Sequence, residues 1–422
     1  MFYIVSCEIL VRQIFSLTIL EKFIKIYIGD KCMAKMTKKQ KNNIKKFAYK
    51  NFFLVLFLIL VLISFLVFAY FQGWLDRFLK PKDETHFKSE AGGYVTTVNS
   101  LQDLRVNFLD VGQGDCIIIE LPDGKNMIID SGQHSKAKNA IQTFATDRNI
   151  TTFDYLLLTH ADSDHVDNMS WVIDTYDIKY IFRPNNYSDN NISKDLPSDF
   201  NTKTDGGYVV TTKVYANFMV SAYAERCPVE IFNKDSDFTN KLIYGGNEYS
   251  YTFDFLTPIA ERNLIAYSDP NNYSPIMMLT FMNKKIMFTG DAEVKMLTEY
   301  VETYGDINNV DVLKVGHHGS ENATTSEFIR AIDPEYAVIQ CGLGNKYKHP
   351  HQEALDRLTS YDSNMKIYRN DTNGKIVLSI GADDFAFSLE NEDCSYNLTA
   401  GENMPSTLSF GRYLQNRQML VA

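Results

Sequence analysis

The sequence predicts a layered sandwich of the α+β or α/β class, in which helices cover the faces of β-sheets. From Leu104 onwards, short apolar stretches alternate with amphipathic ones, which is the pattern of strands mixed with helices. Turn residues such as Gly112-Gln113-Gly114 separate the apolar stretches. In addition, 422 residues with 45% hydrophobic and 13% aromatic content are enough to form a substantial core.

The predicted strands share an apolar or alternating pattern that is bounded by turn residues. In chain order they are 104–111, 115–121, 126–132, 154–160, 178–184, 249–257, the hairpin 276–291 with its turn at Asn283-Lys284, 311–319, 336–342, 375–380 and 384–389. The predicted helices have apolar residues at three- and four-residue spacing. They are 136–148, 168–176, 292–304, 325–332 and 349–361.

Residues 52–71 form an uncharged apolar stretch with the length of a membrane-spanning helix. Lysines are concentrated before this stretch, which predicts a cytoplasmic N-terminus and a large part of the chain outside the cell. A cleaved signal peptide is the alternative, but its apolar core is usually shorter and is followed by a small-residue cleavage site. A start at Met33 or Met36 is also open, because each begins a shorter lysine-rich leader.

We therefore expect the chain to have five parts. They are a basic cytoplasmic segment 1–51, the transmembrane helix 52–71, a linker 72–103, a folded domain 104–390 and a tail 391–422. We also expect the chain to be a single-pass protein of the cell membrane. Within the domain, residues 184–250 break the rhythm of strands and helices. We interpret them as an insertion, either a functional lid or a plain surface loop.

The charge distribution is uneven, because residues 83–422 have a formal charge of −20 while the whole chain has −10. An acidic surface repels phosphate backbones. This disfavours broad binding to long duplex DNA and favours a small or locally presented substrate. No oligomeric state follows from the sequence.

Three clusters of histidine and aspartate come directly after predicted strands, where a rigid scaffold presents side chains to a cleft. Their members are His160, Asp162, Asp164 and His165; Asp291; and His317 and His318. Imidazole and carboxylate groups are the ligands that a water-activating divalent ion needs. Each cluster alone has a structural explanation, such as a turn or a surface pair. Their common position at strand ends predicts a metal centre.

The motifs THADSDH, FTGDAE and LKVGHHGS resemble those of the metallo-beta-lactamase superfamily. The stretch NFLDVGQGDCIIIELPDG, followed by MIIDSG, is similar to the hydrolase domain of the ComEC-type competence proteins. The resemblance covers about residues 104–390. It implies a four-layer αββα sandwich with a metal cleft along one edge, and a hydrolase that binds one or two divalent ions, Zn²⁺ or Mn²⁺.

The same resemblance implies roles for individual residues. The seven residues of the three clusters are expected metal ligands, with Asp291 as the bridge, Asp164 as either ligand or proton acceptor, and His317 preferred over His318. Asp162 stands where the superfamily usually has a histidine, so the site is richer in oxygen and suits Mn²⁺ as well as Zn²⁺. His349 is a candidate general acid or substrate contact, or else helps to begin a helix. Residues expected to orient ligands or contact substrate are Asp110, Gln113, Asp115, Asp130, Asn272 and Ser274.

Together, these expectations predict a membrane-anchored hydrolase that faces outward. In it, metal-bound hydroxide attacks phosphorus or an acyl carbon. The predicted substrates are phosphodiesters of nucleic-acid ends, nucleotides or the cell envelope. Two alternatives stay open. One is a non-catalytic metal-binding partner in a DNA-uptake or envelope complex, and the other is a beta-lactam or thioester hydrolase.

Overall fold

The computed structural model describes residues 92–201, 206–259, 267–306, 309–382 and 384–405, together with Lys39 and Ser64. The chain divides into two compact units, Met1–Pro81 and Lys82–Ala422. Almost all of the predicted segments 1–51 and 52–71, and most of the linker 72–103, lie outside the described residues. Among the residues that are described, no helix has both the length and the apolar character needed to cross a membrane.

Two eight-stranded sheets form the second unit. Sheet A has the order β1-β12-β13-β14-β15-β16-β17-β18 and sheet B the order β11-β8-β6-β4-β3-β2-β19-β20. The strands of sheet A are β1 (Val95–Thr97), β12 (Phe238–Tyr244), β13 (Asn247–Phe255), β14 (Met277–Phe281), β15 (Lys284–Phe288), β16 (Val312–Lys314), β17 (Tyr336–Ile339) and β18 (Lys366–Arg369). Those of sheet B are β2 (Leu104–Phe108), β3 (Ile117–Glu120), β4 (Asn126–Ile129), β6 (Tyr155–Leu157), β8 (Ile181–Arg183), β11 (Val229–Ile231), β19 (Ile376–Ile380) and β20 (Phe385–Leu389).

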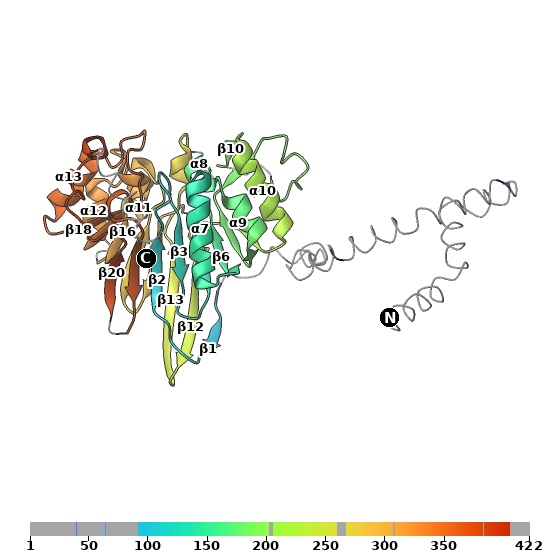
Figure 1. Cartoon of the computed structure of the whole chain (residues 1–422), viewed down its shortest axis with the longest axis horizontal. Coiled ribbons are helices and arrows are strands. Elements are labelled where there is room, and N and C mark those ends of the chain that lie inside the picture. Colours follow the sequence, from blue (N-terminus) through green and yellow to red (C-terminus); the bar gives the residue numbers. More distant parts are fainter. Residues whose placement is uncertain are drawn as a thin grey trace, which may run out of the picture. The chain divides into compact units, whose positions relative to one another are not determined.

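Helices cover the outer face of each sheet, so that the domain has four layers (Figure 1). Sheet B is covered by α7 (His134–Arg148), α9 (Met169–Thr175) and α10 (Lys213–Glu225), and sheet A by α11 (Val294–Tyr304), α12 (Ser326–Ile332) and α13 (Gln352–Tyr361). A third apolar cluster, which includes Phe108, Phe182 and Phe253, fills the space between the sheets. Strands buried on both faces read as continuous apolar runs such as that of β3. The predicted αββα sandwich is confirmed.

Most predicted elements correspond to observed ones, but several predicted strands extend too far. The strand predicted over 311–319 ends at Lys314 because His317 and His318 have positive φ values of 48° and 54°, which no strand can continue. The hairpin turns at Met282 and Asn283, which both have positive φ, one residue earlier than predicted.

The segment 184–250 contributes strands to both sheets. It supplies β11 at the edge of sheet B and β12 in sheet A, and it contains α10 on the outer face of sheet B. It also contains a small parallel pair formed by β9 (Asn186–Ser188) and β10 (Tyr208–Val210). Which part of this segment is an insertion therefore stays a prediction.

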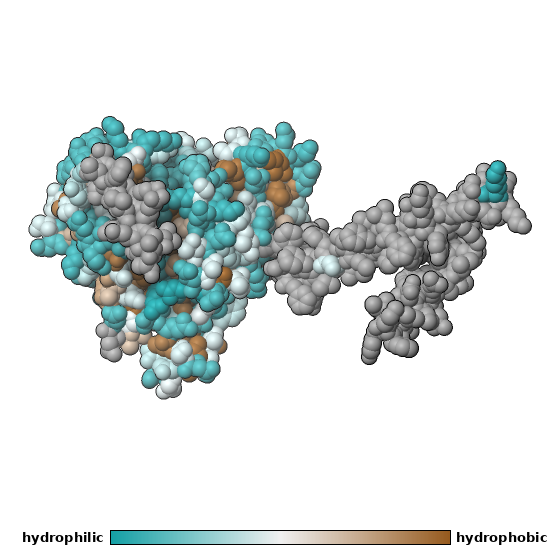
Figure 2. Space-filling view, in the orientation of Figure 1, coloured by the Kyte–Doolittle hydropathy of each residue, from teal (hydrophilic) through white to brown (hydrophobic). Residues whose placement is uncertain are grey.

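A buried arginine is among the residues that hold the chain beyond β20 against the domain, together with Thr372 and Asn373. Nε and Nη2 of Arg369 contact the carboxylate of Asp371 at 2.9 and 2.6 Å. Nη1 donates to the backbone oxygens of Tyr396, Asn397 and Thr399. In the orientation of Figure 2 the surface of the domain is mostly hydrophilic, and apolar colour forms small separate areas.

Candidate metal centre

The predicted histidine and aspartate clusters meet at one end of the sandwich, just beyond the ends of three strands. The chain after β6 runs through His160 into the short helix α8 (Ser163–Val166). Asp291 follows β15, and a 3-10 turn, η4 (Gly316–Gly319), follows β16. Because β15 and β16 are parallel neighbours, their carboxyl ends present these residues at the same edge of sheet A. Sheet B supplies the remaining cluster.

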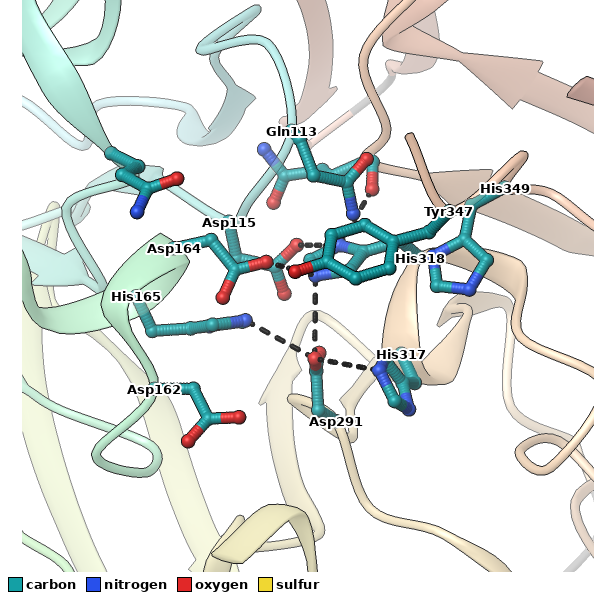
Figure 3. A network of polar contacts seen from close by, with 12 residues as sticks. Gln113, Asp115, Asp162, Asp164, His165, Asp291, His317, His318, Tyr347 and His349 are labelled. Carbon is teal, nitrogen blue, oxygen red and sulfur yellow. Dashed lines mark hydrogen bonds and ion pairs between the residues drawn. The ribbon is translucent and has the colours of Figure 1, made fainter. Parts of the chain in front are cut away.

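The carboxylate of Asp291 lies at the middle of this arrangement (Figure 3). Four imidazole nitrogens face its Oδ2 atom: Nε2 of His165 at 3.2 Å, of His318 at 3.3 Å, of His317 at 3.7 Å and of His160 at 3.9 Å. Asp291 is almost completely buried, as are all of these histidines except His317. The structure therefore brings together residues that lie as much as 158 positions apart.

The two remaining acids of the first cluster lie at different depths. Asp164 Oδ2 is 3.4 Å from His318 Nε2, and the side chain is mostly buried. Asp162 Oδ2 is 4.0 Å from His160 Nε2, and 45% of its side chain is exposed. Asp162 belongs to none of the compact groups that could hold an ion within the described residues. It lies at the rim of the site, where we propose a weaker or solvent-shared contact.

The two histidines of η4 are not equivalent. His318 Nε2 faces both Asp291 and Asp164, and the residue is 1% exposed. His317 turns its Nδ1 to Glu293 Oε1 at 3.0 Å, and its side chain is 23% exposed. The geometry thus favours His318 as the ligand, rather than the His317 that the sequence led us to prefer.

Several side chains hold the histidines so that their Nε2 atoms point to the centre. Asp130 contacts His165 Nδ1 at 2.7 Å and accepts from both the backbone and the hydroxyl of Thr159. His160 Nδ1 lies 3.1 Å from the Thr159 hydroxyl and 3.2 Å from that of Ser274. The backbone N–H of Asp291 also donates to Ser274 Oγ. Such contacts fix the ring orientation of a metal-binding imidazole.

The other predicted residues have varied positions. Asn272 accepts from the backbone N–H groups of Glu293 and Met296 at the start of α11, so it supports the chain that carries Asp291. Asp110 faces away from the centre, pairing with Lys136 at 2.7 Å. Gln113 accepts from the N–H of Gly342 at 3.4 Å, joining two loops at the site.

His349 lies beside the two histidines of η4. Its ring centroid is 5.4 Å from that of His317 and 6.0 Å from that of His318, and the residue is 5% exposed. Burial, with the neighbouring histidine charges, lowers the pKa of His349 to about 3. Tyr347 is stacked on it at 5.6 Å and is 48% exposed.

Electrostatic effects oppose one another at this site. Burial alone would raise the pKa of Asp291, but the charges of His165, His318 and His317 outweigh it, so that its pKa is well below the ordinary value. Burial alone would lower the pKa of His165, but Asp291 and Asp130 raise it well above the ordinary value. For His160 burial prevails, assisted by the charge of His165, and lowers its pKa to about 4.

The residues present fit a divalent cation. The Nε2 atoms of His160, His165 and His318 and the Oδ1 atom of Asp291 are buried and have no hydrogen-bond partner. Two overlapping groups bring ligand atoms within 4.8 Å of one another: His160, His165 and Asp291; and Asp164, His165 and His318. Buried polar atoms without partners are costly, and a cation between these lone pairs would satisfy them.

Four contributors to the site were not predicted, namely Thr159, Lys314, Glu293 and Tyr347. Lys314 forms a buried ion pair with Asp115 at 2.6 Å, and Glu293 bonds to His317. A lysine within the apolar run of β16 was a usable signal, because a fully buried lysine requires a partner. Glu293 and Tyr347 gave no comparable signal, because single acidic or aromatic residues in loops are common.

We expect the substitution Gly114→Ala to weaken metal binding about tenfold or more, because positions that orient ligands have effects of this size. Gly114 has φ +121°, and a Cβ atom there would lie 2.2 Å from the backbone oxygen of Asp164. The ligand-bearing loop would therefore have to move. Gly124→Ala is the matched control, since Gly124 also has positive φ (+82°) but its nearest atom, in Gln102, is 3.9 Å away. Chelator competition measures the affinity, and equal values for the two variants would contradict the expectation.

The sequence matches a family model described as the metallo-beta-lactamase superfamily over residues 109–188. It is 27% identical over 287 residues to ComE operon protein 3 of Bacillus subtilis (strain 168), covering 64% of this chain and 32% of that protein. It is 23% identical over 282 residues to competence protein ComA of Neisseria gonorrhoeae, covering 65% and 32%. It is 26% identical over 268 residues to recombination protein 2 of Haemophilus influenzae, covering 61% and 27%.

The chain thus spans about a third of the length of the curated relatives it matches. The shared motifs lie in the part of the chain that forms the four-layer sandwich, and the histidines and aspartates of those motifs converge on Asp291. On these grounds the folded domain is similar to the metallo-beta-lactamase superfamily over residues 109–188, and to the corresponding part of the ComEC-type competence proteins.

Proposed function

We propose that this protein is a metal-dependent phosphodiesterase with one or two Zn²⁺ or Mn²⁺ ions at the candidate centre. The observation that supports this most is the convergence of four imidazoles on the buried carboxylate of Asp291. Mixed nitrogen and oxygen ligands suit both metals. A divalent ion bound there would lower the pKa of a coordinated water towards about 7 and polarise a phosphoryl oxygen.

The residues of the chain would have separate roles as metal ligands, proton acceptor, orienting residue and substrate contact. His160, His165, Asp164, Asp291 and His318 are the proposed ligands. Asp164 is also a proposed proton acceptor, because it contacts His318 and its side chain is 18% exposed, against 3% for Asp291. Asp130 would keep His165 in its orientation through their 2.7 Å contact. His349 would contact the substrate beside η4, with Tyr347 forming part of the entrance.

We further propose that the enzyme is anchored through residues 52–71, with its N-terminus in the cytoplasm and its folded domain outside the cell. The uncharged stretch and the lysines before it support this orientation. The formal charge of −20 on residues 83–422 supports a small or locally presented phosphodiester over long duplex DNA.

The test is hydrolysis of bis-p-nitrophenyl phosphate by the full-length chain after loading with Mn²⁺ or Zn²⁺. We expect metal-dependent release of p-nitrophenol that a chelator stops and that added metal restores. Nitrocefin and an acyl-thioester are assayed in parallel, because preferential turnover of either would favour the beta-lactam or thioester alternative. Protein that contains metal and hydrolyses none of these esters would support a non-catalytic binding role instead.

A further inference from the structure

A lysine with no exposed surface lies at the base of the candidate centre. Lys314 ends β16 and is 0% exposed. Its ammonium group is 2.6 Å from Asp115 Oδ2 and donates to the backbone oxygen of Val315 at 3.0 Å. A buried ammonium is tolerated only where an opposite charge and hydrogen bonds compensate for its lost hydration. Lys314 and Asp115 therefore act as one electrostatic unit.

Asp115 extends from this pair towards the ligands. Its Oδ1 atom lies 3.2 Å from His318 Nδ1. That nitrogen is closer to the backbone oxygen of Gln340, at 2.9 Å, and we assign this oxygen as its hydrogen-bond acceptor. Apart from this contact with His318, Asp115 Oδ1 is buried without a hydrogen-bond partner among the described residues. Asp115, Asp291 and His318 have ligand atoms within 4.8 Å of one another, so Asp115 is a carboxylate that a cation could recruit.

Beyond Asp115, the surroundings of Lys314 leave little room for water. A cavity of about 10 Å³ beside it is lined by Asp115, Thr159, Gly290 and apolar side chains. This volume is at the lower limit for a single water molecule. An ammonium in such surroundings acts on nearby charges through a low local dielectric, where electrostatic interactions are several times stronger than in water.

Lys314 is also the one fixed positive charge paired with the acids of the site. The carboxylates concerned are Asp115, Asp130, Asp162, Asp164 and Asp291. In the described ranges, no other lysine or arginine forms an ion pair with any of these carboxylates. Their other ion-pair partners are histidines.

We propose that Lys314 is a built-in cation that holds Asp115 out of the set of metal ligands and thereby limits the affinity of the centre for divalent ions. Removing the ammonium frees a carboxylate beside His318 and removes a repulsive positive charge. The consequence is unusual, because loss of a buried side chain tightens metal binding. A purely structural role predicts the opposite, since a disturbed ligand set binds more weakly.

The test is a charge series in the full-length chain, with Mn²⁺ affinity measured by competition with a fluorescent chelator and bound metal counted by elemental analysis. Lys314→Met is expected to bind Mn²⁺ at least about tenfold more tightly, and Asp115→Asn more weakly by a similar factor. The double variant should return close to the parent affinity. Lys284→Met is the matched control, because Lys284 forms an ion pair of the same 2.6 Å length with Asp311 at the opposite end of β15.

Weaker or unchanged binding by Lys314→Met would overturn the proposal. If that variant fails to fold, the other two decide it. If Asp115→Asn binds Mn²⁺ weakly and the double variant binds it as tightly as the parent does, the proposal is supported. If Asp115→Asn and the double variant bind Mn²⁺ equally weakly, the proposal is overturned. Because the readout is metal affinity, the outcome is separate from whether the protein hydrolyses phosphodiesters.

Discussion

Replacing Asp291 with alanine is expected to remove metal from the candidate centre and to lower phosphodiester hydrolysis by about a thousandfold or more, because the proposed histidine ligands surround this one carboxylate. Its Oδ2 atom faces four imidazole nitrogens between 3.2 and 3.9 Å away. No neighbouring acid faces all four of these histidines, since Asp164 forms an ion pair only with His318 among them, Asp162 lies at the rim and Asp115 is paired with Lys314.

Elemental analysis and the rate on bis-p-nitrophenyl phosphate measure the two effects separately. The control is Asp333→Asn. Asp333 ends α12 with φ 49°, a conformation that asparagine adopts readily. That variant should keep the parent metal content and rate. An Asp291→Ala protein with a full complement of metal would remove the basis for placing the centre at this carboxylate.

The largest expected loss of stability follows from replacing Arg369 with alanine, which should lower the free energy of unfolding by about 3–5 kcal/mol, as for other broken buried ion pairs. The guanidinium is fully buried and contacts Asp371 through two nitrogens. Its removal leaves that carboxylate buried without its partner. Three backbone oxygens between Tyr396 and Thr399 also lose a donor.

Urea unfolding measures this change. Arg330→Ala is the comparison, because Arg330 is 59% exposed and its pair with Glu327 is a surface contact, worth at most about 1 kcal/mol. The double variant Arg369→Ala with Asp371→Ala should be less destabilised than Arg369→Ala alone, since it leaves no unpaired charge. Equal losses from Arg369→Ala and Arg330→Ala would show that the buried network contributes little.

The sandwich could be predicted because its strands carry their pattern locally. Central strands such as β3 begin with an apolar run, here three isoleucines, and α11 and α13 carry apolar residues at helical spacing. The place of β11 could not be predicted, because it pairs with β8, which lies much earlier in the sequence. The packing of α10 on sheet B likewise depends on distant residues. β12 was missed although it forms a hairpin with β13 across Gly245-Gly246, which is a local signal.

The candidate site was predictable to a similar extent. Spacing at strand ends was enough to group His160, His165 and Asp291. It could not choose between His317 and His318, because positive φ at both residues decides which ring turns inward. It also could not show that Asp110 bonds outward to Lys136, or that Lys314 reaches Asp115. Those contacts depend on how loops from the two sheets meet.

An early strand and a late strand of sheet B lie side by side. β19 pairs antiparallel with β2 along the whole of Leu104–Phe108, so the sheet behind His160 and His165 is completed by residues that follow every candidate ligand in the chain. Until Ile376–Ile380 has left the ribosome, β2 would present an open edge whose backbone groups invite pairing with another molecule. A chain truncated before Ile376 would retain every candidate ligand and yet be prone to aggregate.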